Sequence, residues 1–269
     1  MGSTQLETQC TLERGVRMDL MPISKRLPRL IAMTTLVGSN NYNLNTESSD
    51  KDYKLFVVPT FEDLYAGELF STPNIITPDV DYDIHDIRQL PQLLWKANIN
   101  YMETLYSISI NFTCFNSAPS ELFQLIALRD TLMRMNIPKF YASCLGTHRQ
   151  KMLLLHKGTE STQTLVDKFG YDTKQACHAI RVLDAAERFH DTDFKDFKLS
   201  IWYDNADPMR KVLLDIKGGE YTEKEFVELA TEKAAKMSTL AADFDKFEAD
   251  KYTLEMANNL IKNFVKKYM

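Results

Sequence analysis

The first part of the chain contains two short apolar segments with the length of buried β-strands. The pattern predicts one strand over Ile31–Val37 and a second over about residues 52–58, which Pro59 ends because proline cannot donate a hydrogen bond within a sheet. Directly afterwards, Thr60 has the position of an N-cap, and the acidic residues that follow favour a short helix over Phe61–Ala66. This part therefore predicts two strands followed by a short helix.

A third segment alternates between polar and apolar positions over residues 74–84. Side chains on a strand point to alternate faces, so Asp79, Asp81 and Asp83 share one face of this predicted third strand. Three acids on one face make a poor surface for packing against another sheet. They are instead a suitable platform for metal ions.

From Asp86 onward the apolar residues recur at helical spacing, and beyond about residue 118 almost the whole chain follows this pattern. Breaker residues such as Gly, Pro and Asn separate the predicted helices. These helices cover residues 120–135, 138–156, 173–189, 222–247 and 252–268. The pattern predicts an α+β fold, in which a small mixed sheet with helices, residues 1–112, precedes a mostly helical domain, residues 113–269. We expect a ligand to bind in the cleft between the two.

The composition is that of a globular protein rather than a membrane protein. The 269 residues are 44% hydrophobic and 26% charged, which suffices for one large domain or two modest ones. No apolar run reaches the roughly 18 residues that cross a bilayer. Charged residues interrupt the N-terminal segment, which lacks the apolar region of a signal peptide. We therefore expect a cytoplasmic protein with no membrane partner.

Cysteine spacing and net charge exclude some other classes of site. The four cysteines stand far apart, at Cys10, Cys114, Cys144 and Cys177, which argues against a zinc site and against a disulfide framework. The formal charge of -5 gives no overall attraction to nucleic acid. A polynucleotide partner would therefore need a local basic surface. The sequence leaves the oligomeric state open.

The strongest chemical signal is a glycine-serine pair followed by two alternate carboxylates. Gly38 and Ser39 follow the first strand; glycine lets the backbone approach a phosphate, and serine supplies a hydroxyl and an amide donor. Asp50 and Asp52 share one face at the start of the second strand. Two such carboxylates can bridge a pair of Mg²⁺ ions about 4 Å apart, or Mn²⁺ in their place, as phosphoryl or nucleotidyl transfer requires. The sequence therefore predicts a nucleoside-triphosphate site with two metal ions.

A second set of candidate residues lies on the predicted helix over residues 173–189. Lys174, His178 and Arg181 stand at i, i+4 and i+7, so they share one side of this helix. Such a basic stripe could clamp the outer phosphates of a triphosphate from across the cleft. A solvated helix face without a ligand is the other interpretation of the same spacing.

Together these elements resemble the DNA polymerase beta-like nucleotidyltransferase superfamily. Its signature is a Gly-Ser turn, an Asp-x-Asp strand and a later carboxylate between apolar residues, here Gly38 and Ser39, Asp50 and Asp52, and Asp81. More narrowly, residues 30–190 resemble the bacterial and phage branch called RNA repair pathway nucleotidyltransferases. That closer likeness rests on Tyr42, Thr46, Ser49, the Val58-Pro59 pair, Asp86 to Arg88, Lys96, Asn98, Asn100, Glu103 and Leu105, with Lys174 and Arg181 to Leu183 in the second half.

The resemblance implies a Mg²⁺-dependent enzyme that transfers a nucleoside monophosphate from a triphosphate to a hydroxyl and releases pyrophosphate. It implies that the acceptor is RNA, plausibly a tRNA end, and that Asp50, Asp52 and Asp81 hold the metals and carry the catalysis. Asp83 shares the face of Asp81 and is the alternative third carboxylate. The expected nucleotide-binding residues are Gly38, Ser39, Ser49, Lys174, His178 and Arg181.

Two positions depart from the pattern of the branch. Asn40 stands where an arginine commonly follows Gly-Ser, and Asn43 stands where glycine is usual. These departures affect the contacts expected with phosphate and base rather than the metal site. Two other functions remain open: the same transfer to a protein or small-molecule acceptor, and a catalytically inactive nucleotide-binding protein.

Overall fold

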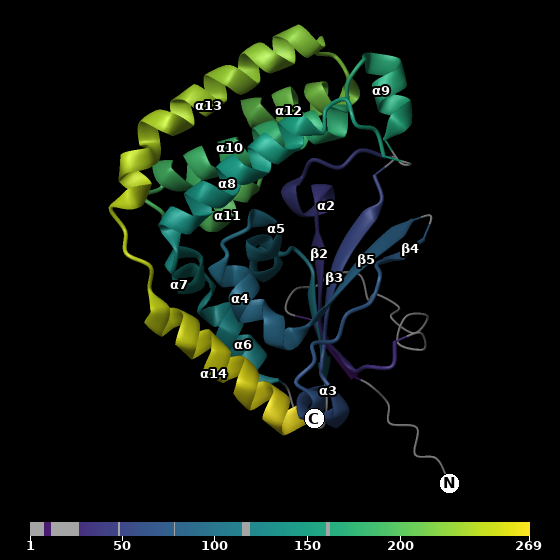
Figure 1. The fold of residues 1–269 in the computed structure, drawn as a ribbon, viewed down its shortest axis with the longest axis vertical. Coiled ribbons are helices and arrows are strands. Elements are labelled where there is room, and N and C mark those ends of the chain that lie inside the picture. Colours follow the sequence, from purple (N-terminus) through teal and green to yellow (C-terminus); the bar gives the residue numbers. More distant parts are fainter. Residues whose placement is uncertain (1–7, 12–26, 48, 78, 115–118, 160–161) are drawn as a thin grey trace.

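The protein has an α+β fold, as the sequence predicts. The structure is a computed structural model that describes residues 8–11, 27–47, 49–77, 79–114, 119–159 and 162–269. Figure 1 shows a single sheet with the larger helices gathered on one side of it, and the long C-terminal helices along the outer edge of the molecule.

Within the described residues the sheet has six strands, in the order β1-β6-β2-β3-β5-β4. The strands are β1 (Thr8–Thr11), β2 (Ile31–Val37), β3 (Lys51–Val57), β4 (Ile75–Ile76), β5 (Val80–Asp86) and β6 (Ile110–Cys114). Strands β3 and β5 run parallel, whereas the other neighbours are antiparallel, so the sheet is mixed. The parallel pair matters for the site because it places residues of β3 and β5 side by side at the same end.

The single strand predicted over residues 74–84 is wrong, because two strands occupy this region. A tight turn separates β4 from β5: the Thr77 hydroxyl donates to the carbonyl of Val80 at 2.7 Å and accepts from its amide at 3.1 Å. Of these two strands only β5 carries acids toward the site, and Asp79 precedes it. Strand β1 lies in a stretch where the sequence shows no periodicity, and it is held by pairing with β6.

The helical pattern of the second half is confirmed, with three additions and one break. The helices are α2 (Ser39–Tyr42), α3 (Phe61–Ala66), α4 (Leu90–Trp95), α5 (Ile99–Met102), α6 (Ser120–Ala127), α7 (Arg129–Arg134), α8 (Ile137–Leu153), α9 (Gln163–Phe169), α10 (Thr173–Asp191), α11 (Phe197–Ile201), α12 (Pro208–Gly218), α13 (Glu223–Asp245) and α14 (Lys251–Tyr268), with 3-10 turns at Ile87–Gln89 and Glu103–Tyr106. Helices α9, α11 and α12 are not among those predicted. The helix predicted over residues 120–135 is broken into α6 and α7 at Leu128.

One large apolar cluster joins the sheet to the helices. It includes Met33 and Phe56 of the sheet together with Phe140 of α8, and it extends to Val265 near the C-terminus. Helix α10 lies at its centre, since most of its residues are buried. Strand β6 runs across residue 112, at which the sequence divides the chain into two domains. No helix in the described ranges has the length and apolar character needed to cross a membrane.

Candidate functional site

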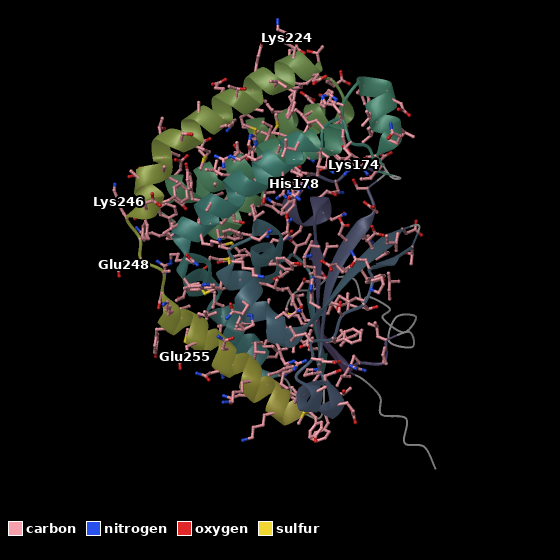
Figure 2. The ribbon with its side chains drawn as sticks, viewed as in Figure 1. Lys174, His178, Lys224, Lys246, Glu248 and Glu255 are labelled. Atoms are coloured by element: carbon pink, nitrogen blue, oxygen red, sulfur yellow. The ribbon has the colours of Figure 1, made fainter. Side chains whose placement is uncertain are left out.

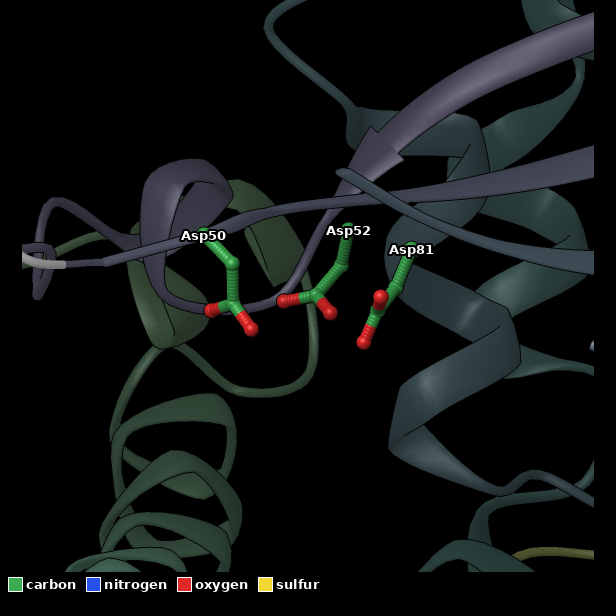
Figure 3. Close-up of side chains that lie close together, drawn as sticks. All are labelled: Asp50, Asp52 and Asp81. Carbon is green, nitrogen blue, oxygen red and sulfur yellow. The ribbon is translucent and has the colours of Figure 1, made fainter. Parts of the chain in front are cut away.

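Three aspartates converge at the end of the parallel strand pair. Asp50 immediately precedes β3, Asp52 lies in β3, and Asp81 of β5 is the register partner of Asp52. One carboxylate oxygen from each lies within 4.8 Å of the others. Figure 3 shows the three side chains pointing the same way from neighbouring strands. The structure thus brings together the three residues that the sequence selects as metal ligands.

Asp83, the alternative third carboxylate, lies elsewhere on the same face and is already engaged. It accepts a hydrogen bond from the ammonium of Lys54, and its Oδ2 lies 3.0 Å from His85 Nε2. Burial alone would raise the pKa of Asp83, but the hydrogen bond from His85 and the charge of Lys54 lower it to about 2. In contrast, the buried Oδ1 of Asp81 has no hydrogen-bond partner among the described residues. Asp81 is therefore the third carboxylate of the cluster.

This difference predicts opposite results for two neighbouring substitutions. Asp81→Asn is expected to weaken Mn²⁺ binding by about tenfold or more, because it removes a hard oxygen ligand and one negative charge. Asp83→Asn is expected to leave Mn²⁺ affinity nearly unchanged and to lower thermal stability, because it leaves Lys54 buried without its ion-pair partner. Calorimetric titration measures the Mn²⁺ affinity of each variant, and thermal melting measures its stability. Equal loss of Mn²⁺ binding in the two variants would contradict the assignment.

The electrostatics of the cluster suit a divalent cation. Burial and the charges of Asp50 and Asp81 raise the pKa of Asp52 to about 6, against the opposing charges of Lys54 and Lys174. Burial, and then the charge of Asp50, raise the pKa of Asp81 as well. Like charges at this spacing repel each other unless a cation neutralises them. Carboxylate oxygens are the ligands that Mg²⁺ and Mn²⁺ prefer, so the residues present fit these ions.

The raised pKa of Asp52 predicts a pH-dependent metal affinity. A metal ligand must be deprotonated, so Mn²⁺ binding is expected to weaken as the pH falls through about 6. With a chelator present, the effect of pH on folding stability has the opposite sign. Between the usual pKa of Asp and pH 6, the folded state binds more protons at Asp52 than the unfolded chain does. Lowering the pH through this range therefore stabilises the fold. Titration with Mn²⁺ on either side of pH 6, with melting curves in chelator, tests both signs. A Mn²⁺ affinity that stays the same on both sides of pH 6 would contradict the prediction.

Gly38 lies against the cluster in a conformation that only glycine adopts readily. Its φ of 71° and ψ of -153° fall outside the regions open to L-residues with a side chain. A Cβ at this position would stand 2.4 Å from the Oδ2 of Asp52. The absence of a side chain therefore creates the space in which the Asp52 carboxylate lies.

The buried side chain of Glu103 holds the Gly-Ser turn in place through hydrogen bonds. Its Oε2 accepts hydrogen bonds from the amide of Gly38 and from the side-chain nitrogen of Asn41, both at 3.1 Å. Its Oε1 accepts from the hydroxyl of Tyr42. The side chain is 2% exposed, and burial raises its pKa. The sequence assigns no role to Glu103, although it belongs to the residues that carry the family resemblance.

The two departures from the family pattern have local structural reasons. Asn43 adopts a left-handed conformation with φ of 62°, which asparagine tolerates better than most residues other than glycine. Its side-chain nitrogen donates to the carbonyl of Tyr203 at 2.7 Å. Asn40 donates to the backbone carbonyl of Asp50 at 2.8 Å. Both asparagines thus hold the loop that presents Asp50.

A cavity of about 780 Å³ opens beside the carboxylates, between the Gly-Ser turn, the loop before β3 and helix α10. Asp50 lines it, and so do all six residues that the sequence selects for nucleotide binding: Gly38, Ser39, Ser49, Lys174, His178 and Arg181. Figure 2 labels Lys174 and His178 on α10, near the end of the sheet at which α2 lies.

The basic stripe on α10 is not a uniformly solvated face. Lys174 is exposed, but Arg181 is only 6% exposed, and its guanidinium lies 3.9 Å from the centroid of the Tyr42 ring. The Nη1 of Arg181 has no hydrogen-bond partner among the described residues. Burial, and then the charge of Arg181, lower the pKa of His178 well below its usual value, so its imidazole is neutral. Within the part of the chain that the structure describes, Arg181 thus keeps one donor without a partner at the cavity wall, although the charge of the buried Glu103 already acts on its guanidinium.

Comparisons with known proteins do not extend this picture. No protein-family model matches the sequence, and no curated protein matches it either. The resemblance to the nucleotidyltransferase superfamily therefore stays a prediction. The geometry of the site stands independently of it.

Lys217 is a cavity residue that sequence reasoning does not find. It comes from α12, and its ammonium donates to the carbonyl of Leu44 at 3.1 Å and to the hydroxyl of Ser49 at 3.2 Å. Burial lowers its pKa, and the neighbouring Lys174 lowers it further. No local pattern marks this lysine, because its role depends on how α12 packs against the loop before β3.

Proposed function

We propose that the protein is a Mg²⁺-dependent nucleotidyltransferase that moves a nucleoside monophosphate from a triphosphate to a hydroxyl acceptor on RNA. The observation that carries the proposal is the pairing of two opposite charge clusters around one cavity. Asp50 lines the cavity and clusters with Asp52 and Asp81, and the cations Lys174, Arg181 and Lys217 line the same cavity. A metal-bound triphosphate has the complementary arrangement of charges.

The cationic side of the cavity would bind the outer phosphates. The guanidinium of Arg181 has a donor without a partner in the described ranges and is held in place against the ring of Tyr42. A guanidinium in a fixed orientation favours binding of a phosphate oxygen over binding of water. The exposed Lys174 supplies a second charge from the same helix. Together these groups would hold the leaving pyrophosphate after the bond to the α-phosphate breaks.

The acidic side would position the reacting groups. Asp50, Asp52 and Asp81 would hold the divalent ions, which when bound neutralise charge on the triphosphate and lower the pKa of the acceptor hydroxyl. Gly38 lets the backbone approach the phosphates closely, and Ser39 adds a hydroxyl donor at the same turn. The network around Glu103 keeps this turn rigid, as in-line attack requires.

Incubation with each of the four α-labelled triphosphates, Mg²⁺, total RNA and total protein tests the proposal. Label is expected in the RNA fraction together with released pyrophosphate, and the Asp81→Asn variant provides the blank. Label in the protein fraction would indicate the same transfer reaction with a protein, not RNA, as the acceptor. Triphosphate binding without pyrophosphate release, equal in wild type and variant, would overturn the proposal in favour of a nucleotide sensor.

A further inference from the structure

We infer that a groove between α5 and α8 binds the phosphate backbone of a single-stranded RNA acceptor and leads its end to the carboxylates. The inference rests on the proposed function and names the partner of that site. The groove has a volume of about 480 Å³. Lys96, Asn98 and Tyr101 form one wall, and Lys139 and Ser143 of α8 form the other.

The charge of the groove is uniformly positive. Lys96 and Lys139 are both exposed, and neither forms an ion pair with any residue in the described part of the chain. Among the described residues, no carboxylate lines the groove. Lys139 also lies in the first turn of α8, where the helix dipole adds positive potential. In a protein with a net charge of -5, such a local surface is where a polyanion would bind.

The short helix α5 contributes residues both to the catalytic cavity and to the groove. Asn100 of this helix lines the cavity, and the next residue, Tyr101, lines the groove. The ammonium of Lys54 lies 4.7 Å from the centroid of the Tyr101 ring. Lys54 stands two residues after Asp52 on the same face of β3, so the Tyr101 wall of the groove lies near the carboxylate cluster.

This position separates the acceptor from the leaving group. The cations proposed to hold the pyrophosphate belong to α10 and α12, whereas the groove belongs to α5 and α8. An in-line displacement needs the attacking hydroxyl and the leaving oxygen on opposite sides of phosphorus. Contacts through lysine ammonium groups read phosphates rather than bases, so binding in the groove is expected to tolerate many sequences.

The test measures RNA binding directly, without catalysis. The probe is a 5′-fluorescent single-stranded oligoribonucleotide of about 12 nucleotides, titrated by anisotropy in chelator so that the carboxylate site plays no part. The double variant Lys96→Gln and Lys139→Gln is expected to bind roughly tenfold more weakly. The slope of log K against log salt is expected to become shallower by about 1.4, since each lost phosphate contact removes about 0.7.

The matched control removes two lysines from α14, with Lys251→Gln and Lys262→Gln. Both are exposed, and neither forms an ion pair within the described ranges, so RNA affinity and salt slope are expected to equal those of wild type. Unchanged RNA affinity in the groove variant, or equal losses in both variants, would overturn the inference. If RNA affinity depends on the groove lysines but the protein releases no pyrophosphate, the inference of an RNA-binding groove is supported. The proposed function is then rejected on its own.

Discussion

Replacing Asp52 by asparagine is expected to lower nucleotidyl transfer by roughly 1,000-fold or more, equivalent to about 4 kcal/mol of lost transition-state stabilisation. Asp52 is the central carboxylate, with Asp50 before it in the chain and Asp81 beside it in the sheet. Its removal would take away one of the three proposed metal ligands. Pyrophosphate release from labelled triphosphate measures the loss.

The same substitution is expected to stabilise the protein in the absence of divalent ions. Burial and two neighbouring carboxylates raise the pKa of Asp52 to about 6, so its charged form is disfavoured in the folded state at neutral pH. A neutral asparagine removes that repulsion, and we expect a gain of about 1 kcal/mol after solvent screening. Melting in chelator tests this sign. A variant that lost both activity and stability would indicate misfolding rather than loss of a ligand.

Replacing Gly38 by alanine is expected to abolish metal binding and to destabilise the fold by about 2 kcal/mol or more. The added methyl group would meet the Asp52 carboxylate at 2.4 Å, and the backbone would have to keep a φ of 71° with a ψ of -153°. Either Asp52 or the turn must move, and both hold the site. Melting curves and Mn²⁺ titration measure the two effects.

Gly67 offers the matched control for this substitution. It also has a positive φ, of 70°, but it ends α3 in a left-handed conformation with no atom within 4 Å of an added Cβ. Gly67→Ala is therefore expected to cost about 1 kcal/mol and to leave Mn²⁺ affinity unchanged. Similar Mn²⁺ affinities in the two alanine variants would contradict the close approach of Gly38 to Asp52.

The parts of the fold that follow local rules are predictable from the sequence. The strand over Ile31–Val37 and the helix over Phe61–Ala66 have the predicted bounds, because an apolar run specifies the first and a capping box at Thr60 specifies the second. Strand geometry also predicts that Asp50 and Asp52 share a face, whereas the choice of Asp81 as the third carboxylate comes from the family resemblance.

The remaining features depend on contacts between distant segments. Strand β1 forms because β6 offers it a pairing edge, which its own residues do not signal. Glu103 and Lys217 act at the site only because the Glu103–Tyr106 turn and α12 pack against the Gly-Ser turn and the loop before β3. Arg181 has the spacing of an exposed stripe, and only the fold places it over Tyr42.

The fastening of the loop before β3 to a much later part of the chain has a consequence for biosynthesis. The carbonyl of Leu44 and the hydroxyl of Ser49 are held by Lys217, and the carbonyl of Asn43 accepts from Arg210 at 2.8 Å. A nascent chain that has completed its strands still lacks these anchors. We therefore expect the loop that presents Asp50 to reach its final position only after α12 has been synthesised and has packed against it.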